Sequence, residues 1–312
     1  MPRYRHELPQ LSDELFLTDG GLGTTLVYHE GVHLPGFASF VLLDDDEGRD
    51  ILRNYFRRYA EIAQKYQVGF IFESMTWRAG CEWGTKIGYS PAQMEGFNRL
   101  GIQLLEGIRK EYEGKVPHMI VSGCVGPRCE GYSVGEAMTA DEAEVYHTPH
   151  VRIFQETKAD MVAAQTIPSI AEGLGLALAS RSLEMPIAIS FTLETDGKLP
   201  SGESLKDAIE QIDDATDAAP AYYMINCAHP THFMHIFDDG EWTNRIRGIR
   251  ANASTKSHTE LCMATELDSG DPSDLAARYL DLKSKLRKLN IIGGCCGTDH
   301  RHIEEMCRAF VK

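Results

Sequence analysis

The chain has 312 residues, of which 43% are hydrophobic and 25% charged, and these are ordinary values for a globular protein. Its 31 Lys and Arg against 46 Asp and Glu give a net charge of −15, which argues against a nucleic-acid partner because phosphate binding needs a basic surface. No apolar run approaches the roughly 20 residues of a membrane helix, and residues 1–10 lack the apolar segment of a signal peptide. We therefore expect a cytoplasmic protein with no membrane partner.

Eight short apolar runs recur along the chain, and continuous runs of this kind are typical of strands buried on both faces. The runs are Leu15–Thr18, Val68–Phe72, Met119–Ser122, Met161–Ala164, Ile187–Phe191, Tyr222–Ile225, Ile249–Ala251 and Ile291–Ile292. The seventh is the weakest prediction because arginines interrupt it.

Helix signals separate these runs. Apolar residues recur every three or four positions over residues 49–67, and residues 44–47 form an acidic entry to that helix. Further helix starts are predicted after Ser90, Thr139, Ser169 and Asp271, each followed by a capping glutamate or glutamine or by proline. Strands that alternate with helices in this way predict a single (β/α)8 TIM barrel, one domain over residues 1–312 with its core at about residues 12–311. An open doubly wound sheet is the alternative.

Three cysteines directly follow predicted strands: Cys227 after the sixth, and Cys295 and Cys296 after the eighth. The carboxyl ends of the strands carry the chemistry in a barrel of this kind. Three thiolates with an open fourth position are typical of a catalytic zinc site. Buried packing cysteines are the main alternative, and a disulfide between the adjacent pair is a weaker one. The other five of the eight cysteines are expected to pack, because eight are too few for a disulfide scaffold.

Other motifs carry less weight. His229, His232 and His235 follow Cys227 at spacings that could place two of them on one helix face, but we expect structural or surface roles for them. The sequence GLGTTL at residues 21–26 lacks the third glycine of a dinucleotide fingerprint.

Taken together, the motifs resemble the homocysteine S-methyltransferase family. The matching segments, in the family's order, are LTDGGLGTTL (17–26), MTWRAG (75–80), GCVGP (123–127), ADMVAAQTIPSIAEG (159–173), PIAISFTLETDGKLPSGESL (186–205), INCAHPTH (225–232) and IIGGCCGT (291–298). The pair formed by GGCCGT and the upstream NC is the most specific of them.

The resemblance implies a barrel in which Cys227, Cys295 and Cys296 bind Zn²⁺ and a substrate thiol becomes the fourth ligand. It further implies an S-methyltransferase whose partners are small molecules, a thiol acceptor and a sulfonium or quaternary ammonium donor. Homocysteine is the expected acceptor and methionine the product. Asp19 matches a position that family members use to hold the amino group of homocysteine. Zinc coordination keeps a thiol deprotonated and nucleophilic, so no general base is required for the transfer.

Two positions depart from the family pattern. Gln165 stands where the family usually has a glutamate that binds the ammonium of homocysteine, and Arg78 stands where a glutamine is common. Both changes would make the pocket more positive if both residues face it. We therefore expect Gln165, Arg78 and Trp77 at the substrate site, with either an acceptor that lacks an amino group or a donor that carries a carboxylate for Arg78 to bind. The alternative is that Arg78 points away from the pocket and Asp19 still binds homocysteine.

The aromatic residues Trp77, Trp83 and Tyr89 follow the second predicted strand. They could hold a methylated cation by cation–π attraction, or they could simply pack. Two other functions stay open. A zinc hydrolase would normally use His or carboxylate ligands and a positioned base, which the thiolate set lacks. A barrel that binds zinc or a methylated ligand without turnover is the non-enzymatic alternative.

Overall fold

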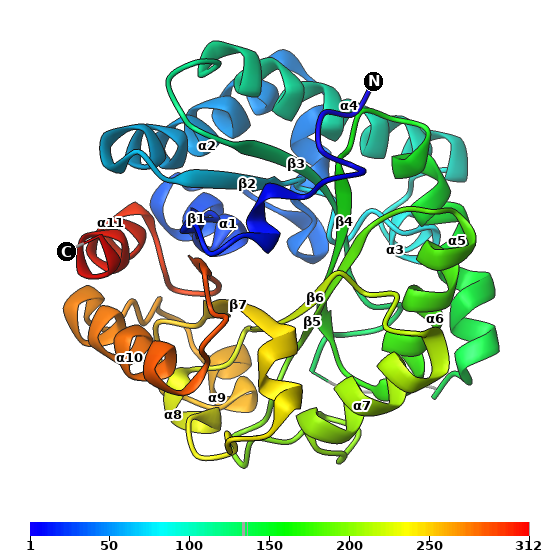
Figure 1. Ribbon diagram of the computed structural model, residues 1–312. Helices are drawn as coiled ribbons and strands as arrows, with labels where there is room; N and C mark the ends of the chain where they lie inside the picture. Colours follow the sequence, from blue (N-terminus) through cyan, green and yellow to red (C-terminus); the bar gives the residue numbers. More distant parts are fainter. Residues whose placement is uncertain (133–134, 136, 312) are drawn as a thin grey trace.

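The computed structural model describes residues 1–132, 135 and 137–311, and Figure 1 shows a ring of strands surrounded by helices. The strands are β1 (Phe16–Leu17), β2 (Gly69–Glu73), β3 (Met119–Val125), β4 (Met161–Ile167), β5 (Ile187–Phe191), β6 (Tyr222–Asn226), β7 (Ile246–Ala251) and β8 (Ile291–Gly294). Each coincides with or overlaps one of the eight predicted runs, including the seventh.

Helices follow the strands, and their starts agree with the predicted caps. The helices are α1 (Leu22–Thr24), α2 (Asp46–Tyr66), α3 (Cys81–Lys86), α4 (Pro91–Glu111), α5 (Ala140–Gln155), α6 (Ile170–Ser182), α7 (Leu205–Thr216), α8 (Pro230–Phe233), α9 (His258–Met263), α10 (Pro272–Lys285) and α11 (His300–Phe310). Ser90, Thr139, Ser169 and Asp271 all accept hydrogen bonds from backbone N–H groups at the starts of α4, α5, α6 and α10. The acidic run does form a helix entry, because Asp45 caps α2.

The sheet closes in chain order from β1 to β8, and every pairing is parallel. The short β1 completes the ring, since Phe16 lies beside Gly69 of β2 on one side and Ile291 of β8 on the other. The predicted (β/α)8 barrel is confirmed, and the doubly wound alternative is wrong because an open sheet would leave two unpaired edges.

The barrel interior is layered. Its lower part is a separate apolar cluster, made of Phe16, Ile71, Ile120, Met161, Ala188, Tyr222, Met224 and Ile291, with Leu8 from the N-terminal segment packed against it. A larger cluster lies between the strands and the helices. Because side chains alternate between the two faces of a strand, the positions two or four residues beyond this inner layer also point inward. Most of those positions are polar, and they form the floor of the site.

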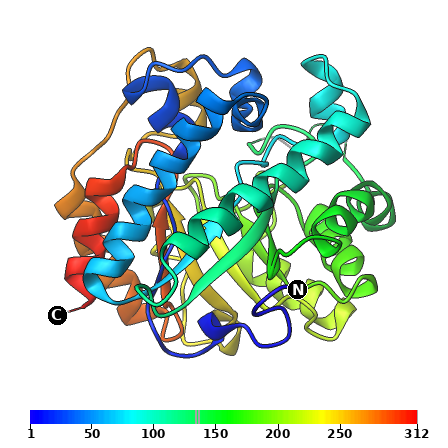
Figure 2. The ribbon, with the colours of Figure 1, turned by 90° about the horizontal axis from the view of Figure 1, so that it is seen from above.

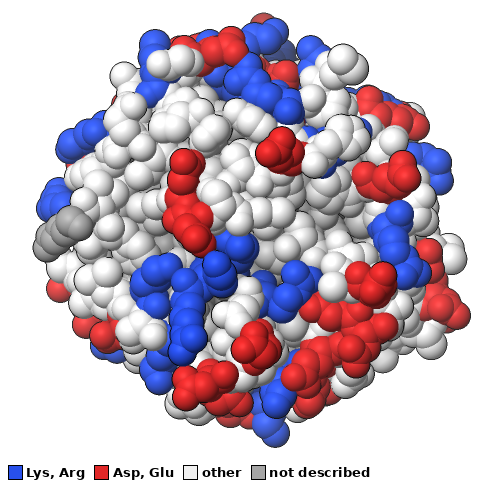
Figure 3. Space-filling model, viewed as in Figure 1, with Lys and Arg blue, Asp and Glu red and all other residues white. Residues whose placement is uncertain are grey.

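Loops gather at the carboxyl ends of the strands. Figure 2 shows residues 22–43, α3 and the segment around α9 at the upper end of the barrel, with the N-terminal segment at the opposite end. On the face shown in Figure 3, basic and acidic side chains lie interspersed, and acidic ones gather at the lower right. None of the described helices combines the length and the apolar character that crossing a membrane requires.

Candidate metal centre and substrate pocket

A cavity of about 480 Å³ opens at the carboxyl ends of the strands. Its described lining includes every residue that the sequence assigned to the site: Asp19, Trp77, Arg78, Gln165, Cys227, Cys295 and Cys296. The structure therefore brings these positions together, although they are spread over almost 280 residues of chain. This is the arrangement expected for a barrel whose chemistry lies at the strand ends.

The three predicted ligands form one cluster. The Sγ atoms of Cys227, Cys295 and Cys296 all lie within 4.8 Å of one another, and they are the one group of metal-ligating type found among the described residues. Cys227 is buried, whereas Cys295 and Cys296 are half-buried on the pocket wall. In the structure, Cys227 and Cys295 are joined by a disulfide. Only thiolates can ligate a metal, so this pair must be reduced before the cluster can hold one.

The backbone around the cluster depends on glycine. A Cβ added at Gly293 would lie 1.8 Å from Thr18 Oγ1, and one added at Gly294 would lie 2.0 Å from Thr298 Oγ1. A side chain at Gly293 would therefore push β8 away from the residue that follows β1, and one at Gly294 would collide with the turn after β8. Gly297, directly after the cysteine pair, has a φ of +82°, which glycine adopts without steric cost.

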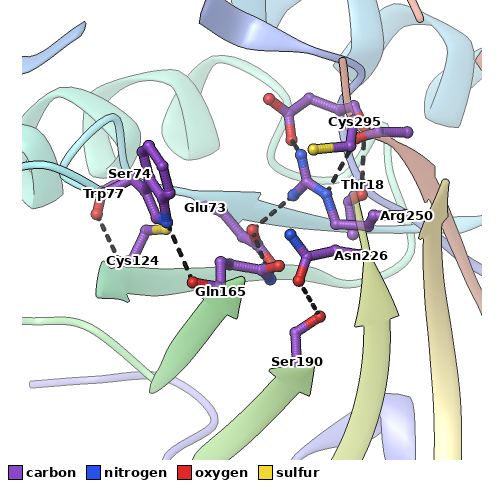
Figure 4. Close-up of polar contacts among 12 residues, drawn as sticks. Thr18, Glu73, Ser74, Trp77, Cys124, Gln165, Ser190, Asn226, Arg250 and Cys295 are labelled. Atoms are coloured by element: carbon purple, nitrogen blue, oxygen red, sulfur yellow. Dashed lines mark hydrogen bonds and ion pairs between the residues drawn. The ribbon is translucent and has the colours of Figure 1, made fainter. Parts of the chain in front are cut away.

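A buried ionic network forms the pocket floor beside the cysteines (Figure 4). Arg250 of β7 donates from Nη2 to Asp19 Oδ1 at 2.7 Å and from Nη1 to Glu73 Oε2 at 2.5 Å. Its Nε donates to the carbonyl of Gly294 at 3.2 Å. Tyr55 donates to the other Asp19 oxygen at 2.9 Å. One guanidinium thus bridges carboxylates from β1 and β2 while contacting the strand that leads to Cys295.

Gln165 belongs to the same network. Its Nε2 donates to both oxygens of Glu73, at 2.9 and 3.1 Å, while its Oε1 is buried and has no hydrogen-bond partner among the described residues. A carboxyl group from β2, that of Glu73, thus lies directly against Gln165 of β4. The amide keeps one unused acceptor in the pocket wall.

Burial sets the charges of this network. It raises the pKa of Asp19 and of Glu73 above the usual carboxyl range, although Arg250 opposes the shift in both cases. Burial also works to lower the pKa of Arg250, but the two carboxylates outweigh it and raise that pKa. Because the guanidinium stays charged, it favours the ionised form of at least one of its two carboxyl partners.

Asn226 holds the backbone next to Cys227. Its Oδ1 accepts from the Thr166 N–H at 2.8 Å and from Ser190 Oγ at 2.7 Å, and its Nδ2 donates to Thr166 Oγ1 at 2.7 Å. Thr166 has a φ of +64° and Cys227 a φ of +56°, conformations that non-glycine residues seldom adopt. Through these three hydrogen bonds Asn226 orients the backbone that leads into Cys227.

Arg78 forms the opposite part of the wall. Its guanidinium carbon lies 4.2 Å from the Trp77 ring centroid and 3.5 Å from that of Trp83. Trp77 Nε1 donates to the Gln165 carbonyl at 3.1 Å, which fixes the indole against β4. The two tryptophans therefore stack on a cation of the protein itself. Tyr89, the third aromatic residue considered, packs against Phe40 and Phe97 and is not among the described pocket residues.

Acidic side chains lie beside both departures from the family pattern. Arg78 and Gln165 do face the pocket, but Glu130 lies against the first and Glu73 against the second. Two arginines stand against five acidic residues among the described lining residues, so that 2 − 5 gives −3. The acidic residues are Asp19, Glu73, Glu130, Glu266 and Asp268.

The histidines after Cys227 are structural, as expected. His229 caps α8 through Thr231, His232 bonds the Thr255 carbonyl, and His235 is exposed. A different histidine, His258, lines the pocket and stacks on Tyr132 with ring centroids 4.1 Å apart. Burial lowers its pKa to about 4, so it is neutral at physiological pH.

The remaining cysteines differ in burial. Cys124 and Cys307 are buried, Cys129 is half-buried and Cys81 is exposed, whereas the side chain of Cys262 lies outside the described residues. Cys124 also lines the pocket, and burial raises the pKa of its thiol.

The sequence assignment missed Glu73, Arg250 and His258. Glu73 directly follows the second predicted run, and Arg250 is one of the arginines that interrupt the seventh. Both were detectable, because each lies two residues beyond an inward-facing position of its strand: Ile71 on β2 and Gly248 on β7. For His258, which begins α9, the sequence carries no comparable signal.

Comparison with known proteins agrees with this architecture. The sequence pattern that defines the homocysteine S-methyltransferase family matches residues 16–310. Homocysteine S-methyltransferase 1 of Brassica oleracea is 21% identical over 315 residues, covering 94% of this chain and 92% of the relative. Homocysteine S-methyltransferase YbgG of Bacillus subtilis is 22% identical over 309 residues, covering 94% of this chain and 93% of the relative.

Solved structures share the fold. The oxidized form of the Escherichia coli homocysteine methyltransferase MmuM superposes with a TM-score of 0.74 at 19% identity, over 97% of this chain and 99% of that one. Its metallated form gives a TM-score of 0.72 at 20% identity, over 97% and 98% of the two chains. The enzyme class expected from the sequence, a methyltransferase, is confirmed by the match over nearly the whole chain, and the protein belongs to the homocysteine S-methyltransferase family.

Proposed function

We propose that this chain transfers a methyl group from a sulfonium or quaternary ammonium donor to a thiol held at Cys227, Cys295 and Cys296, with homocysteine as the acceptor. The observation that carries the proposal is the sulfur cluster itself, three cysteines from two strand ends within 4.8 Å in the wall of a 480 Å³ cavity. Family membership and the names of the relatives support the same chemistry.

We further propose that the resident metal is zinc. Sulfur-rich ligand sets select Zn²⁺ over hard cations such as Mg²⁺ and Ca²⁺, and three protein ligands leave a position for a substrate. The existence of a metallated form of the E. coli enzyme, which has this fold, supports a resident metal. When bound, zinc would keep the acceptor thiol in its thiolate form.

The reaction itself asks little acid–base chemistry of the chain. The acceptor thiolate forms a bond to the methyl carbon of the donor, while the donor's bond to that carbon breaks and its electron pair stays on the departing sulfur or nitrogen. No proton moves in this step, so a pocket whose described histidine, His258, is neutral and buried is compatible with it. The protein's task is to position the two molecules in line.

The floor network supplies the positioning groups. Asp19, the unpaired Gln165 Oε1 and the neighbouring Glu73 would accept N–H groups of the acceptor's ammonium. Asn226 holds Thr166 and the turn into Cys227, and thereby fixes the direction of that sulfur. The floor carries two carboxyl groups and one guanidinium. An acceptor ammonium beside Asp19 or Glu73 would favour the ionised form of that carboxyl group.

A metal assay tests the ligand assignment. Protein purified under reducing conditions should contain one zinc per chain, and a Cys296→Ala variant should lose most of it. Cys81→Ala is the matched control, because Cys81 is exposed and outside the cluster, and it should keep its zinc. Full zinc content in Cys296→Ala would contradict the assignment.

A transfer assay tests the activity. Wild-type protein is incubated with homocysteine and, in separate reactions, S-methylmethionine, S-adenosylmethionine or glycine betaine carrying an isotopically labelled methyl group. Labelled methionine should form with at least one donor, and Cys296→Ala should form none above background. Absence of labelled product from every donor with the zinc-loaded wild type would leave a zinc-binding barrel without this activity.

A further inference from the structure

Arg78 is a buried cation held in a fixed plane. Its side chain is 8% exposed and lies between the rings of Trp77 and Trp83, at 4.2 and 3.5 Å from their centroids. Stacking on aromatic rings suits the flat guanidinium and restricts its rotation. The wall of the pocket therefore presents a preoriented arginine.

The hydrogen-bonding capacity of this arginine is only partly used. Nη2 donates to Glu130 Oε2 at 2.5 Å, and Nη1 makes a long contact of 3.4 Å with the Cys129 carbonyl. Nε is buried and has no partner among the described residues. A guanidinium can bind a carboxylate through two parallel N–H groups, and the contact with Glu130 uses one.

Glu130 is a weakly held partner. Its side chain is 58% exposed, and it belongs to the connection between β3 and α5 rather than to either element. Ion pairs with a solvent-exposed partner contribute little, because water and salt screen the attraction. A carboxylate that reached Arg78 from inside the pocket would be less screened than Glu130.

No other arginine among the described lining residues is available to bind a substrate carboxylate. Among the described lining residues the arginines are Arg78 and Arg250, and Arg250 is already bonded to Asp19 and Glu73. Arg78 is thus the described lining arginine whose ion-pair partner is exposed to solvent. Trp77, which stacks on it, also donates to the Gln165 carbonyl, so this wall is tied to the strand that lies beside Cys227.

We infer that Arg78 is the carboxylate-binding residue of the pocket, and that a carboxylate of one of the two substrates takes the place of Glu130 on its guanidinium. The inference rests on the proposed function for the identity of the ligand as a substrate. It deepens that function by requiring a carboxylate on the acceptor or on the donor. Homocysteine and S-methylmethionine both carry one, so the experiment must separate the two sources.

Binding to reduced, zinc-loaded protein is measured by isothermal titration calorimetry with two matched pairs of probes. Homocysteine is compared with 3-mercaptopropylamine, which is the same thiol without its carboxylate. S-methylmethionine is compared with (3-aminopropyl)dimethylsulfonium, which is the same sulfonium without its carboxylate. The variants are Arg78→Gln, which restores the residue common in the family, and Glu130→Gln.

Arg78→Gln should weaken the carboxylate-bearing member of one pair by about 10- to 100-fold, the range that charge-assisted hydrogen bonds support, and leave its partner within about twofold. The pair that responds identifies the source of the carboxylate. Glu130→Gln should tighten the same probe, because it removes the internal competitor. Arg78→Lys, which keeps the charge but not the fork, should give an intermediate loss.

Three results would overturn the inference. Equal effects of Arg78→Gln on both members of each pair would show that the arginine does not bind a carboxylate of either substrate. Weaker binding in Glu130→Gln would show that the ion pair only holds the segment after β3. Failure of the wild type to bind any of the four probes would show that the pocket takes neither proposed substrate. Unfolding curves of each variant verify that the fold is intact.

The transfer assay keeps this inference distinct from the proposed function. A wild type that methylates no thiol, but whose Arg78 still discriminates the probes, would refute the activity and keep the carboxylate site. If the wild type methylates homocysteine, but Arg78→Gln distinguishes probes with and without a carboxylate as well as the wild type does, the activity would stand and the carboxylate site would be refuted.

Discussion

Arg250 is the cation around which the pocket floor is built. It is 8% exposed, and its two ion-pair partners, Asp19 and Glu73, are 3% and 7% exposed. A buried ion pair adds little net stability by itself, but a buried charge left without its partner is costly. The network therefore matters most through what happens when one member is removed.

Replacing Arg250 tests this directly. Arg250→Met should lower the free energy of unfolding by about 3–5 kcal/mol, because Asp19 and Glu73 would stay buried without a guanidinium. Urea denaturation at pH 7 gives the measurement. The double variant with Glu73→Gln removes one of the stranded charges and should recover part of the loss. An unchanged denaturation midpoint in Arg250→Met would show that the network carries no such energy.

The same variant should respond to pH with a defined sign. Burial already raises the pKa of Asp19 and Glu73, and Arg250 restrains both shifts, so its removal raises these values further. A carboxyl group whose pKa is higher in the folded than in the unfolded protein contributes stability that is lost as the pH rises through the folded value. The destabilisation by Arg250→Met should accordingly be smaller at pH 5 than at pH 7. A larger loss at pH 5 would contradict it.

Single residues were predicted unevenly from the sequence. The three cysteines and Asp19 follow strands directly and belong to specific motifs, so they were found. Gln165 and Arg78 were found as departures, but the compensating partners Glu73 and Glu130 were not. A compensating partner is defined by contact across the barrel or between loops, and single-chain patterns carry no such distance.

At the level of strands, the predicted runs ended too early. β2, β3, β4, β6 and β8 extend beyond them, and β7 begins three residues before its predicted run, because a buried strand was equated with a continuous apolar stretch. The residues left out of the runs include Glu73, Gln165, Asn226 and Arg247. These polar side chains remain in strands because most of them find partners inside the barrel, which an apolar-run criterion cannot foresee.

A helix side chain joins the two strands that carry much of the site. Tyr279 of α10 accepts from the Ala251 N–H at 2.8 Å and donates to the Gly293 carbonyl at 2.6 Å. Ala251 follows Arg250 on β7, and Gly293 precedes the cysteine pair on β8. The tyrosine hydroxyl thus satisfies backbone groups at the point where these strands end.

Removing the Tyr279 hydroxyl should lower the stability of the protein by more than the loss of one atom suggests. Tyr279→Phe should lower the free energy of unfolding by about 1–3 kcal/mol, because a buried N–H and a buried carbonyl lose this partner. Tyr89→Phe is the control, since Tyr89 packs with Phe40 and Phe97 and should change stability by less than about 1 kcal/mol. Equal effects of the two changes would argue against the hydrogen-bonding role.

At the scale of the molecule, the three cysteines proposed as metal ligands span the region where the barrel closes. Cys227 follows β6, whereas Cys295 and Cys296 follow β8, so the cluster bridges two strands that have β7 between them. β8 in turn pairs with the two-residue β1, which completes the ring. A ligand that ties β6 to β8 therefore acts across a short closing contact and should stabilise the whole domain.

Zinc should therefore raise the thermal stability of the reduced protein. A ligand present at 100 times its dissociation constant stabilises the native state by about 2.7 kcal/mol, which for a chain of 312 residues corresponds to about 4 °C in Tm. The measurement compares protein stripped of metal with the same protein plus zinc, both in a reductant that opens the Cys227–Cys295 disulfide.

Cys296→Ala should show a much smaller shift and Cys81→Ala the full one. Without reductant the wild type should also respond weakly, because two of the three sulfurs are then bonded to each other. A full shift in the oxidised protein would mean that zinc stabilises the barrel from somewhere other than this cluster.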